Sequence, residues 1–404
     1  MTNRVVRISQ FLALRRSTLG VFAMVVLVGM GEHMAERFLP IYILALGGGA
    51  IVIGLLQAMD NLLSALYSFP GGYLADRIGT RRSLLIFNLI ALAGFAVVIL
   101  IPSWKAVIAG AALFISWSAV SQPATISLLY RVLPLHKRTM GVSMLSLVRR
   151  IPKALGPLLG GVFIGLWGER DGVRVAFVTA FVMALAALLI QWRLIEPDTP
   201  SAQREPAHHP LLLMRRMNPE LRRLLVSDIL VRFCEQIPFA FVVVWCMKVI
   251  AHPVSAVQFG LLTAVEMGVA ILIYIPVAHL ADQGEKKRYV LITFVFFTLF
   301  PLVLFYCRSF PYLLGAFALR GLKEFGEPTR KSLIMDLSPQ SNRAGMFGLY
   351  YLIRDVVVSL AALGGAFLWR VSPEANLWTA FAFGVAGTLW FAIFGRDVRR
   401  GAAA

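Results

Sequence analysis

Long apolar stretches separated by short polar connections are the main pattern of this 404-residue chain. Each stretch is long enough to cross the roughly 30 Å hydrocarbon core of a membrane as an α-helix. Half of them precede, and half follow, a polar, proline-containing segment at residues 196–223. We therefore predict twelve transmembrane helices, at residues 18–46, 50–75, 83–101, 106–133, 141–167, 173–195, 224–249, 256–281, 289–306, 311–337, 345–369 and 377–394.

The two halves repeat one pattern of special residues at an interval of about 206 positions. Such a duplication in an apolar chain is typical of transporters built from two similar halves around a central site. We therefore predict an all-α membrane protein with two six-helix bundles related by a pseudo-twofold axis, at residues 18–195 and 224–395. Residues 196–223 are the predicted linker, and residues 1–17 and 396–404 the predicted tails. The repeated positions are Gly54, Asp60, Pro70 and Asp76 with Gly260, Glu266, Pro276 and Asp282, and Pro123, Pro134, Arg138 and Arg149 with Pro328, Pro339, Arg343 and Arg354.

Composition and charge agree with a membrane location. Hydrophobic residues make up 58% of the chain and charged residues 15%, against roughly 25% charged residues in soluble domains. The net charge of +18 gathers on one side if both termini are cytoplasmic, as the positive-inside rule requires. We expect a multi-pass protein of the cell membrane, in bacteria the inner membrane, with lipid rather than nucleic acid as its polyanionic partner. The basic residues that fix this orientation include Arg77, Arg81, Arg82, Lys137, Arg138, Lys286, Lys287 and Arg288.

Nothing in the sequence indicates catalysis or a bound cofactor. Cys234, Cys246 and Cys307 lie in apolar runs without the spacing of a zinc site or a disulfide framework. The motifs of metallopeptidases, nucleotide-binding loops and serine hydrolases do not occur in a supporting context. We therefore expect a protein that is not an enzyme and that holds neither a metal nor a cofactor.

The loop after the second predicted helix carries a motif. Residues 71–82 read GGYLADRIGTRR, and residues 278–288 of the second half read AHLADQGEKKR, a weaker copy. The first resembles the signature of the major facilitator superfamily and falls where that family carries it. The resemblance extends over nearly the whole chain and implies alternating access between two bundles. It also implies conformational roles for Gly72, Asp76, Arg77, Gly79, Asp282 and Gly284.

The chain departs from the family pattern in both halves. The acid that usually ends the fourth helix and pairs with the loop motif is replaced by Arg131. The second half keeps its acid as Asp336, but the arginine of its loop has become Gln283. Each half therefore lacks one member of the usual ion pair.

The fifth predicted helix contains a glycine- and proline-rich core. Residues 156–161 read GPLLGG, which resembles the core of a motif of the family's drug and metabolite antiporters. Its Gly156, Pro157, Gly160 and Gly161 would suit close packing and bending at one point. The plainer interpretation is that Gly and Pro are common in membrane helices.

Charged residues within the predicted helices are the candidate site, because a charge at mid-membrane costs about 2.5–3.5 kcal/mol and normally serves a function. Glu32, Glu36 and Glu235, which could exchange a proton as access alternates, lead the proton-coupling candidates. The nearby cations favour either an anionic substrate or simple neutralisation of these acids. The proton-coupling candidates are Glu32, Glu36, Glu235, Asp60, Glu266 and His33. The substrate-binding candidates are Arg37, Arg232, Gln236, Arg320, Lys323, Glu324, Glu327 and Gln122.

The tenth and eleventh predicted helices are rich in ionisable residues. In the tenth helix, the four-residue spacings from Arg320 to Glu324 and from Glu327 to Lys331 allow ion pairs within one helix. Arg330 and Lys331 are expected to reach the cytoplasmic surface by snorkelling. The expected gating residues, at matching depth in the fifth and eleventh helices, are Arg149, Arg150, Arg354 and Asp355.

The sequence thus predicts a secondary active transporter, expected to act as a monomer, that expels a small organic solute by proton antiport. Proton-coupled uptake of an organic anion is one alternative. A sensor or scaffold without transport on the same fold is another, although buried ionisable residues in both halves weigh against it.

Overall fold

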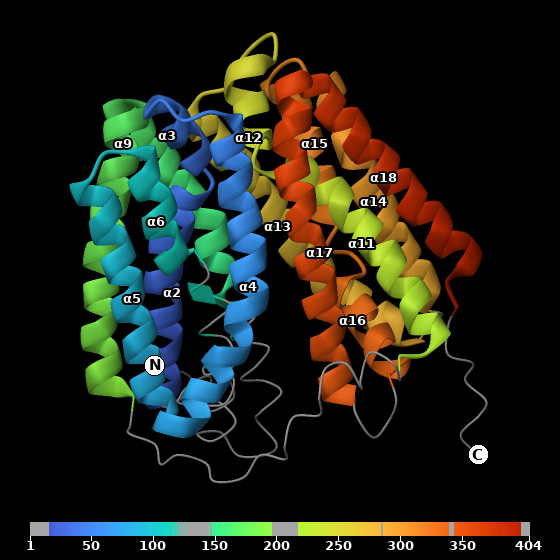
Figure 1. Cartoon of the computed structure of the whole chain (residues 1–404), viewed down its shortest axis with the longest axis horizontal. Coiled ribbons are helices and arrows are strands. Elements are labelled where there is room, and N and C mark those ends of the chain that lie inside the picture. The colour runs from blue at the N-terminus through green and yellow to red at the C-terminus, as the bar shows by residue number, and fades with distance from the viewer. Residues whose placement is uncertain are drawn as a thin grey trace, which may run out of the picture. The chain divides into compact units, whose positions relative to one another are not determined.

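The structure is a computed structural model of the chain. It describes residues 16–115, 148–195, 217–283, 286–338 and 343–396, together with residues 117, 118, 121, 125 and 145. Helices make up nearly all of these residues (Figure 1), which confirms the predicted all-α membrane fold. Most of the predicted linker lies outside the described residues, and the first helix after it begins at Pro219.

The helices follow the predicted segments in order, and some predicted segments are split. The fifth and sixth spans follow each other within α9 and are separated by a kink at Gly168, where φ is +80°. Among the residues that the structure describes, eight helices are long and apolar enough to cross a membrane, or nine if α11 and the bent segment after it count as one span. The number is below twelve because α9 covers two predicted spans, because the seventh and tenth spans are broken, and because the fourth is described only in part. The helices of the first half are α2 (Arg16–Glu36), α3 (Leu39–Ala45), α4 (Ala50–Ile78), α5 (Thr80–Leu100), α6 (Trp104–Phe114) and α9 (Arg150–Leu194). Those of the second half are α11 (Pro219–Phe239), α12 (Val242–Val244), η2 (Trp245–Val249), α13 (Ala256–Gln283), α14 (Lys286–Tyr306), α15 (Phe310–Leu322), α16 (Glu327–Asp336), α17 (Arg343–Val371) and α18 (Pro373–Phe394).

Two predicted helices are interrupted at charged residues. The first predicted span divides between Glu36 and Leu39, where Pro40 in the first turn of α3 cannot continue the helix before it. The tenth divides between Leu322 and Glu327, so the prediction of one continuous helix at residues 311–337 is wrong. Both breaks therefore place irregular backbone next to ionisable side chains, as in transporters whose discontinuous helices form binding sites.

Gly326 makes the break in the tenth span possible. Its N–H donates a hydrogen bond of 2.6 Å to the Thr293 hydroxyl of α14. A side chain there would not fit, because an added Cβ would lie 2.4 Å from that hydroxyl oxygen and 2.6 Å from the Tyr289 carbonyl oxygen. The broken backbone is thus satisfied by a neighbouring helix, as a membrane interior requires.

The helices form two compact units. The first takes in α2, α3, α5, α6, α9 and the part of α4 from Leu63 on, together with Ser255–Ala264. The second takes in the described residues from Met217 onward, except that segment, and also Ala50–Leu62 of α4. Each unit therefore includes the first turns of a helix that continues in the other.

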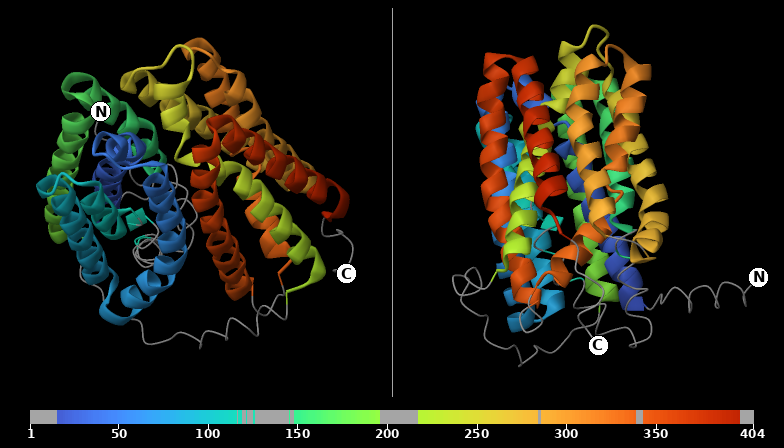
Figure 2. Two further views of the ribbon diagram at one scale, coloured as in Figure 1. Left: turned by 45° about the horizontal axis from the view of Figure 1, so that its top comes forward. Right: turned by 90° about the vertical axis from the view of Figure 1, so that its right-hand side faces the viewer.

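Each unit has its own apolar core. In the first unit, α2 packs along α9, and the rings of Phe95, Phe114 and Phe177 meet with centroids 5.0–6.1 Å apart. In the second unit, α11 lies beside α17 and α18 (Figure 2). Its core residues include Leu221, Phe294, Leu333, Tyr350 and Phe391.

The glycines of the fifth-span motif allow helices of the first unit to approach closely. A Cβ on Gly160 would lie 2.0 Å from the Met34 carbonyl oxygen of α2. A Cβ on Gly161 would lie 2.4 Å from the Ala256 carbonyl oxygen at the start of α13. Pro157 lies inside α9, which stays helical through it. Close packing, as in other helix pairs with small residues, is therefore one role of the motif, and a role in conformational change stays a prediction.

The second half replaces its missing loop arginine with a lysine. Lys286, the first residue of α14, forms an ion pair with Asp336 at the end of α16 and donates a 2.6 Å hydrogen bond to the Ser332 hydroxyl. Lys286 follows Gln283 by three positions, so the retained acid finds its cation one turn further along the chain.

This ion pair is expected to contribute little to stability. The Asp336 side chain is 39% exposed, and exposed pairs contribute about 0–1 kcal/mol. Asp336→Asn should therefore lower the free energy of unfolding by less than about 1 kcal/mol, measured by thermal unfolding of the detergent-purified chain. A loss as large as that from a fully buried acid would contradict this estimate.

Candidate functional site

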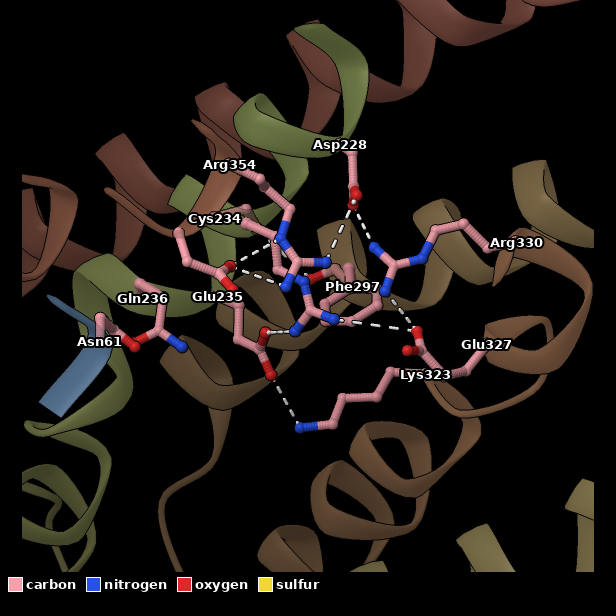
Figure 3. Close-up of polar contacts among 12 residues, drawn as sticks. Asn61, Asp228, Cys234, Glu235, Gln236, Phe297, Lys323, Glu327, Arg330 and Arg354 are labelled. Carbon is pink, nitrogen blue, oxygen red and sulfur yellow. Dashed lines mark hydrogen bonds and ion pairs between the residues drawn. The ribbon is translucent and has the colours of Figure 1, made fainter. Parts of the chain in front are cut away.

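A continuous series of ion pairs runs through the second unit, and Figure 3 shows its part from Lys323 to Arg354. We call this series the charged chain. Its side chains come from five helices, α11, α13, α15, α16 and α17, if Lys323, the C-cap of α15, is counted with that helix. From one end to the other, its members are Arg320, Glu266, Lys323, Glu235, Arg232, Glu327, Arg330, Asp228, Arg354 and Asp355, with Lys331 as a branch from Glu327.

Lys323 joins two acids at the break in the tenth span. Its Nζ lies 2.9 Å from Glu235 Oε1 and 3.3 Å from Glu266 Oε1. Arg320 Nη1 lies 3.5 Å from the other oxygen of Glu266. Arg320 and Lys323 lie in the last turn and at the C-cap of α15, where the helix dipole favours positive charge.

Arg232 and Glu327 link α11 to the second piece of the broken span. Arg232 Nη1 lies 2.5 Å from Glu235 Oε2, and its Nη2 lies 3.8 Å from Glu327 Oε2. Glu327 opens α16, where the dipole favours negative charge. Its carboxylate also pairs with Arg330 at 2.5 Å and with Lys331 at 3.3 Å, as the spacing from Glu327 to Lys331 predicts.

The charged chain ends in a buried group of side chains around Asp228. Arg330 pairs with one oxygen of this acid, and Arg354 Nη1 lies 3.5 Å from the other. The Tyr350 hydroxyl also donates to Asp228, at 3.0 Å. Arg354 Nη2 in turn lies 2.7 Å from Oδ1 of Asp355, the next residue of α17.

The Arg330 side chain is buried, whereas the sequence predicted it at the cytoplasmic surface. The Arg330 side chain is 1% exposed, so the expectation that it snorkels to the cytoplasmic surface is wrong. The reason is Asp228 on α11, which supplies a buried partner from 102 positions away. Sequence reasoning missed Asp228 and Tyr350, although the place of Asp228 one turn before Arg232 was a usable signal.

Aromatic rings cover the cations of the charged chain. The Arg320 guanidinium lies over the rings of Phe300 and Phe317, at 4.9 and 5.7 Å from their centroids. Arg232 and Lys323 lie over Phe297 at 5.4 and 6.0 Å. These cation–π contacts add to the ion pairs where water is excluded.

Apart from Lys331, the charged chain is electrically balanced. Its cations are Arg232, Arg320, Lys323, Arg330 and Arg354, and its acids are Asp228, Glu235, Glu266, Glu327 and Asp355. The Lys331 side chain is 48% exposed and counts with the surface. Of the two interpretations that the sequence allows, mutual neutralisation therefore fits these residues better than a surplus of cations awaiting an anion.

The first unit has a smaller polar group on α2. Glu32 is buried and accepts a 2.7 Å hydrogen bond from the Ser118 hydroxyl. Arg149 donates to the Ser118 carbonyl oxygen at 3.4 Å and to the Thr125 hydroxyl at 3.0 Å. This group therefore connects a proton-coupling candidate with a gating candidate through one serine.

His33 and Glu36 form a contact of their own at the end of α2. The His33 Nδ1 and the Glu36 carboxylate are hydrogen-bond partners. Arg37 follows directly, in the break between α2 and α3. The predicted acids of the first span are thus divided between two local groups, one around Ser118 and one at the helix break.

Two amide side chains meet beside the charged chain. Asn61 of α4 donates a 3.1 Å hydrogen bond from Nδ2 to Gln236 Oε1, next to Glu235 (Figure 3). One residue earlier, Asp60 accepts from Gln57 at 3.3 Å. Gln236 was predicted and Asn61 was not, because an amide in an apolar span gives a weaker signal than a charge.

The remaining predicted residues lie apart from the charged chain or outside the described residues. Gly79 separates α4 from α5 with a φ of +91°, a conformation that favours glycine, and Arg77 is exposed at the end of α4. Arg150 and Glu324 are half-buried. Gln122 and Gly284 lie outside the described residues, as do the side chains of Asp76 and Asp282 and the surroundings of Gly72.

Comparison with known sequences points to one family. The sequence model of the Major Facilitator Superfamily matches residues 21–253 and again residues 230–403. The multidrug resistance protein MdtG of Salmonella paratyphi C is 28% identical over 283 residues, which is 67% of each chain. MdtG of Enterobacter lignolyticus is 29% identical over 273 residues, 64% of this chain and 62% of that one. An uncharacterized MFS-type transporter of Methanocaldococcus jannaschii is 21% identical over 356 residues, 85% of this chain and 86% of the other.

Solved transporter structures share the fold. The nucleoside transporter NupG aligns with a TM-score of 0.80 at 11% identity, over 94% of this chain and 100% of that one. The peptide transporter POT in complex with sulfate aligns with a TM-score of 0.75 at 15% identity, over 94% of this chain and 93% of that one. Identities this low support a common architecture and say nothing about a common substrate.

Proposed function

Because this chain belongs to the Major Facilitator Superfamily, and is therefore a multi-pass membrane transporter, we propose that it expels small organic solutes in exchange for protons. The similarity to multidrug resistance proteins supports export of foreign compounds. The glycine and proline residues at 156–161, which resemble an antiporter motif, support exchange rather than uptake. The proposed location is the bacterial inner membrane, with both termini in the cytoplasm.

The observation that carries this proposal is the position of Lys323 between Glu235 and Glu266. Protonation of either acid removes one of the two charges that hold the lysine, so the lysine can follow the other acid. Lys323 lies at the end of α15, where the tenth span is broken, so its movement can change the angle between α15 and α16. Proton uptake is thereby coupled to the shape of the unit that holds the proposed substrate contacts, Arg232, Gln236 and Glu327.

Inverted membrane vesicles provide the direct test. Three fluorescent compounds of different charge, ethidium, fluorescein and norfloxacin, are supplied outside, and a pH gradient is imposed. We expect gradient-dependent accumulation of at least one compound, which collapses when the gradient is dissipated. Vesicles that accumulate none of the three, or that accumulate them without regard to the gradient, would contradict proton antiport.

Glu235→Gln is expected to separate proton coupling from substrate exchange. The amide keeps the size of the side chain but cannot release a proton, so accumulation driven by the gradient should fall by more than about tenfold. Counterflow exchange of labelled for unlabelled solute, which needs no net proton movement, should persist. The matched control is Glu220→Gln, which removes an acid from the first turn of the same helix, outside the charged chain. Equal loss of both activities in Glu235→Gln would refute the assignment of Glu235 to coupling.

A further inference from the structure

We propose that the charged chain recognises zwitterions, small solutes that carry one anionic and one cationic group, at the link between Arg232 and Glu327. This proposal builds on the proposed export function and assigns a substrate class to its site. The anionic group of the solute would bind Arg232 and its cationic group would bind Glu327. The solute would thus take the place of one ion pair in the charged chain.

The link between Arg232 and Glu327 is the one most easily opened. At 3.8 Å between Nη2 and Oε2 it is the longest ion pair of the charged chain, in which the others span at most 3.5 Å. The Arg232 side chain is 20% exposed and that of Glu327 14%. By contrast, Arg330 and Asp228 at the buried end are almost fully enclosed. The longest separation of the charged chain therefore lies between two side chains that are not fully enclosed.

Opening this link leaves neither side chain alone. Arg232 keeps Glu235 at 2.5 Å, and Glu327 keeps Arg330 at 2.5 Å and Lys331 at 3.3 Å. The large penalty of a buried charge that loses its last partner therefore does not arise. A solute can enter between Arg232 and Glu327 while the rest of the charged chain stays intact.

The charge balance selects the class of solute. Each buried cation of the charged chain has an acid within 4 Å, and the two kinds are equal in number. A solute with a net charge adds an unmatched charge to an apolar surrounding, which is unfavourable. A zwitterion adds none, and each of its groups finds an opposite charge. An uncharged solute fits the balance but cannot replace the ion pair.

The neighbouring side chains suit the rest of such a solute. The Phe297 ring lies 5.4 Å from the Arg232 guanidinium and offers apolar surface. The amides of Asn61 and Gln236, which hydrogen-bond to each other at 3.1 Å, offer uncharged donors and acceptors. A compact amphiphile with an aromatic or aliphatic body between its charges fits these groups.

Four forms of one compound test the proposal. At pH 5.5, phenylalanine is a zwitterion, its methyl ester a cation, N-acetylphenylalanine an anion, and N-acetylphenylalanine methyl ester uncharged. Binding of each to the purified full chain in nanodiscs is measured by titration calorimetry. We expect phenylalanine to bind more than about tenfold more tightly than each of the other three forms. Equal or tighter binding of any one of them would overturn the proposal.

Charge-changing variants give a second, independent result. Glu327→Gln leaves the charged chain with an excess positive charge and should shift the preference to N-acetylphenylalanine. Arg232→Gln leaves an excess negative charge and should shift it to the methyl ester. Lys105→Gln, an exposed lysine outside the charged chain, should keep the wild-type order. An unchanged order in both site variants would overturn the proposal, whichever form the wild type prefers.

The binding experiment and the vesicle experiment test the zwitterion proposal and the export proposal separately. If vesicles accumulate ethidium or fluorescein under a pH gradient but the four forms bind alike, the zwitterion proposal fails and antiport stands. If phenylalanine is preferred but no compound responds to the gradient, antiport fails and the zwitterion proposal stands.

Discussion

Asp228→Asn is expected to lower the free energy of unfolding by about 3–5 kcal/mol, the range for removing one partner of a buried ion pair. Asp228 accepts hydrogen bonds from Arg330 of α16 and Tyr350 of α17 and forms an ion pair with Arg354 of α17. Asparagine keeps the shape but loses the negative charge, so two buried guanidinium groups would lose a shared counter-ion. Chemical denaturation of the purified chain, followed by tryptophan fluorescence, measures the change.

Asp355→Asn is the matched control, because it removes an acid that also pairs with Arg354. The Asp355 side chain is 28% exposed, so water can compensate and the loss should stay below about 1 kcal/mol. In the double variant Asp228→Asn with Arg330→Met, much of the loss should be recovered, because the cation that lost its fully buried counter-ion is gone and Glu327 still has Arg232 and Lys331. Similar losses in Asp228→Asn and Asp355→Asn would show that Asp228 is not the anchor of this group.

The overall architecture was predictable because the membrane restricts what a chain can do. A span must satisfy its own backbone hydrogen bonds and extend over about 20 apolar residues, so hydropathy alone locates α5, α14 and α18 to within a few residues. Gly79 could be placed as well, since only a turn with positive φ explains a glycine between two such helices.

The partners of the charged residues were not predictable in the same way. Position along a span indicates depth in the membrane but not which neighbouring helix a side chain faces. Arg330 therefore looked like a residue of the membrane surface, whereas Asp228 on α11 holds it in the interior. Lys323 likewise pairs with Glu235, which lies 88 positions away. The spacing of Arg320 and Glu324 suggested a local pair, yet Arg320 also reaches Glu266 on α13.

The ion pair of Lys286 and Asp336 shows that motif comparison, too, does not identify the partner of a charged residue. A motif compares residues position by position, and by that measure Gln283 leaves Asp336 without its arginine. The structure instead brings Lys286 to Asp336 from the first turn of α14. The cation that pairs with Asp336 is thus a different residue of the same motif copy, three positions after the one that holds the arginine in the first half.

Gly365→Ala and Gly364→Ala are expected to shift stability in opposite directions. A Cβ on Gly365 would lie 2.2 Å from the Ile237 carbonyl oxygen, and α11 backbone cannot move aside as a flexible side chain could. The same contact is held by Asn376 of α18, which donates to the Gly365 and Ile237 carbonyl oxygens at 2.7 and 3.1 Å. A methyl group there should separate α17 from α11 at a net cost of about 1–3 kcal/mol, as overpacking typically does.

Gly364 provides the contrast within one turn of the same helix. Nothing lies within 4 Å of its added Cβ, so alanine should add about 0.5–1 kcal/mol by restricting the unfolded backbone. Thermal unfolding of both variants is measured side by side in one detergent, so that the effect of the detergent is the same for both. A Gly365→Ala variant as stable as Gly364→Ala would mean that α17 and α11 can separate freely at Gly365, and that Asn376 rather than close backbone contact holds them together.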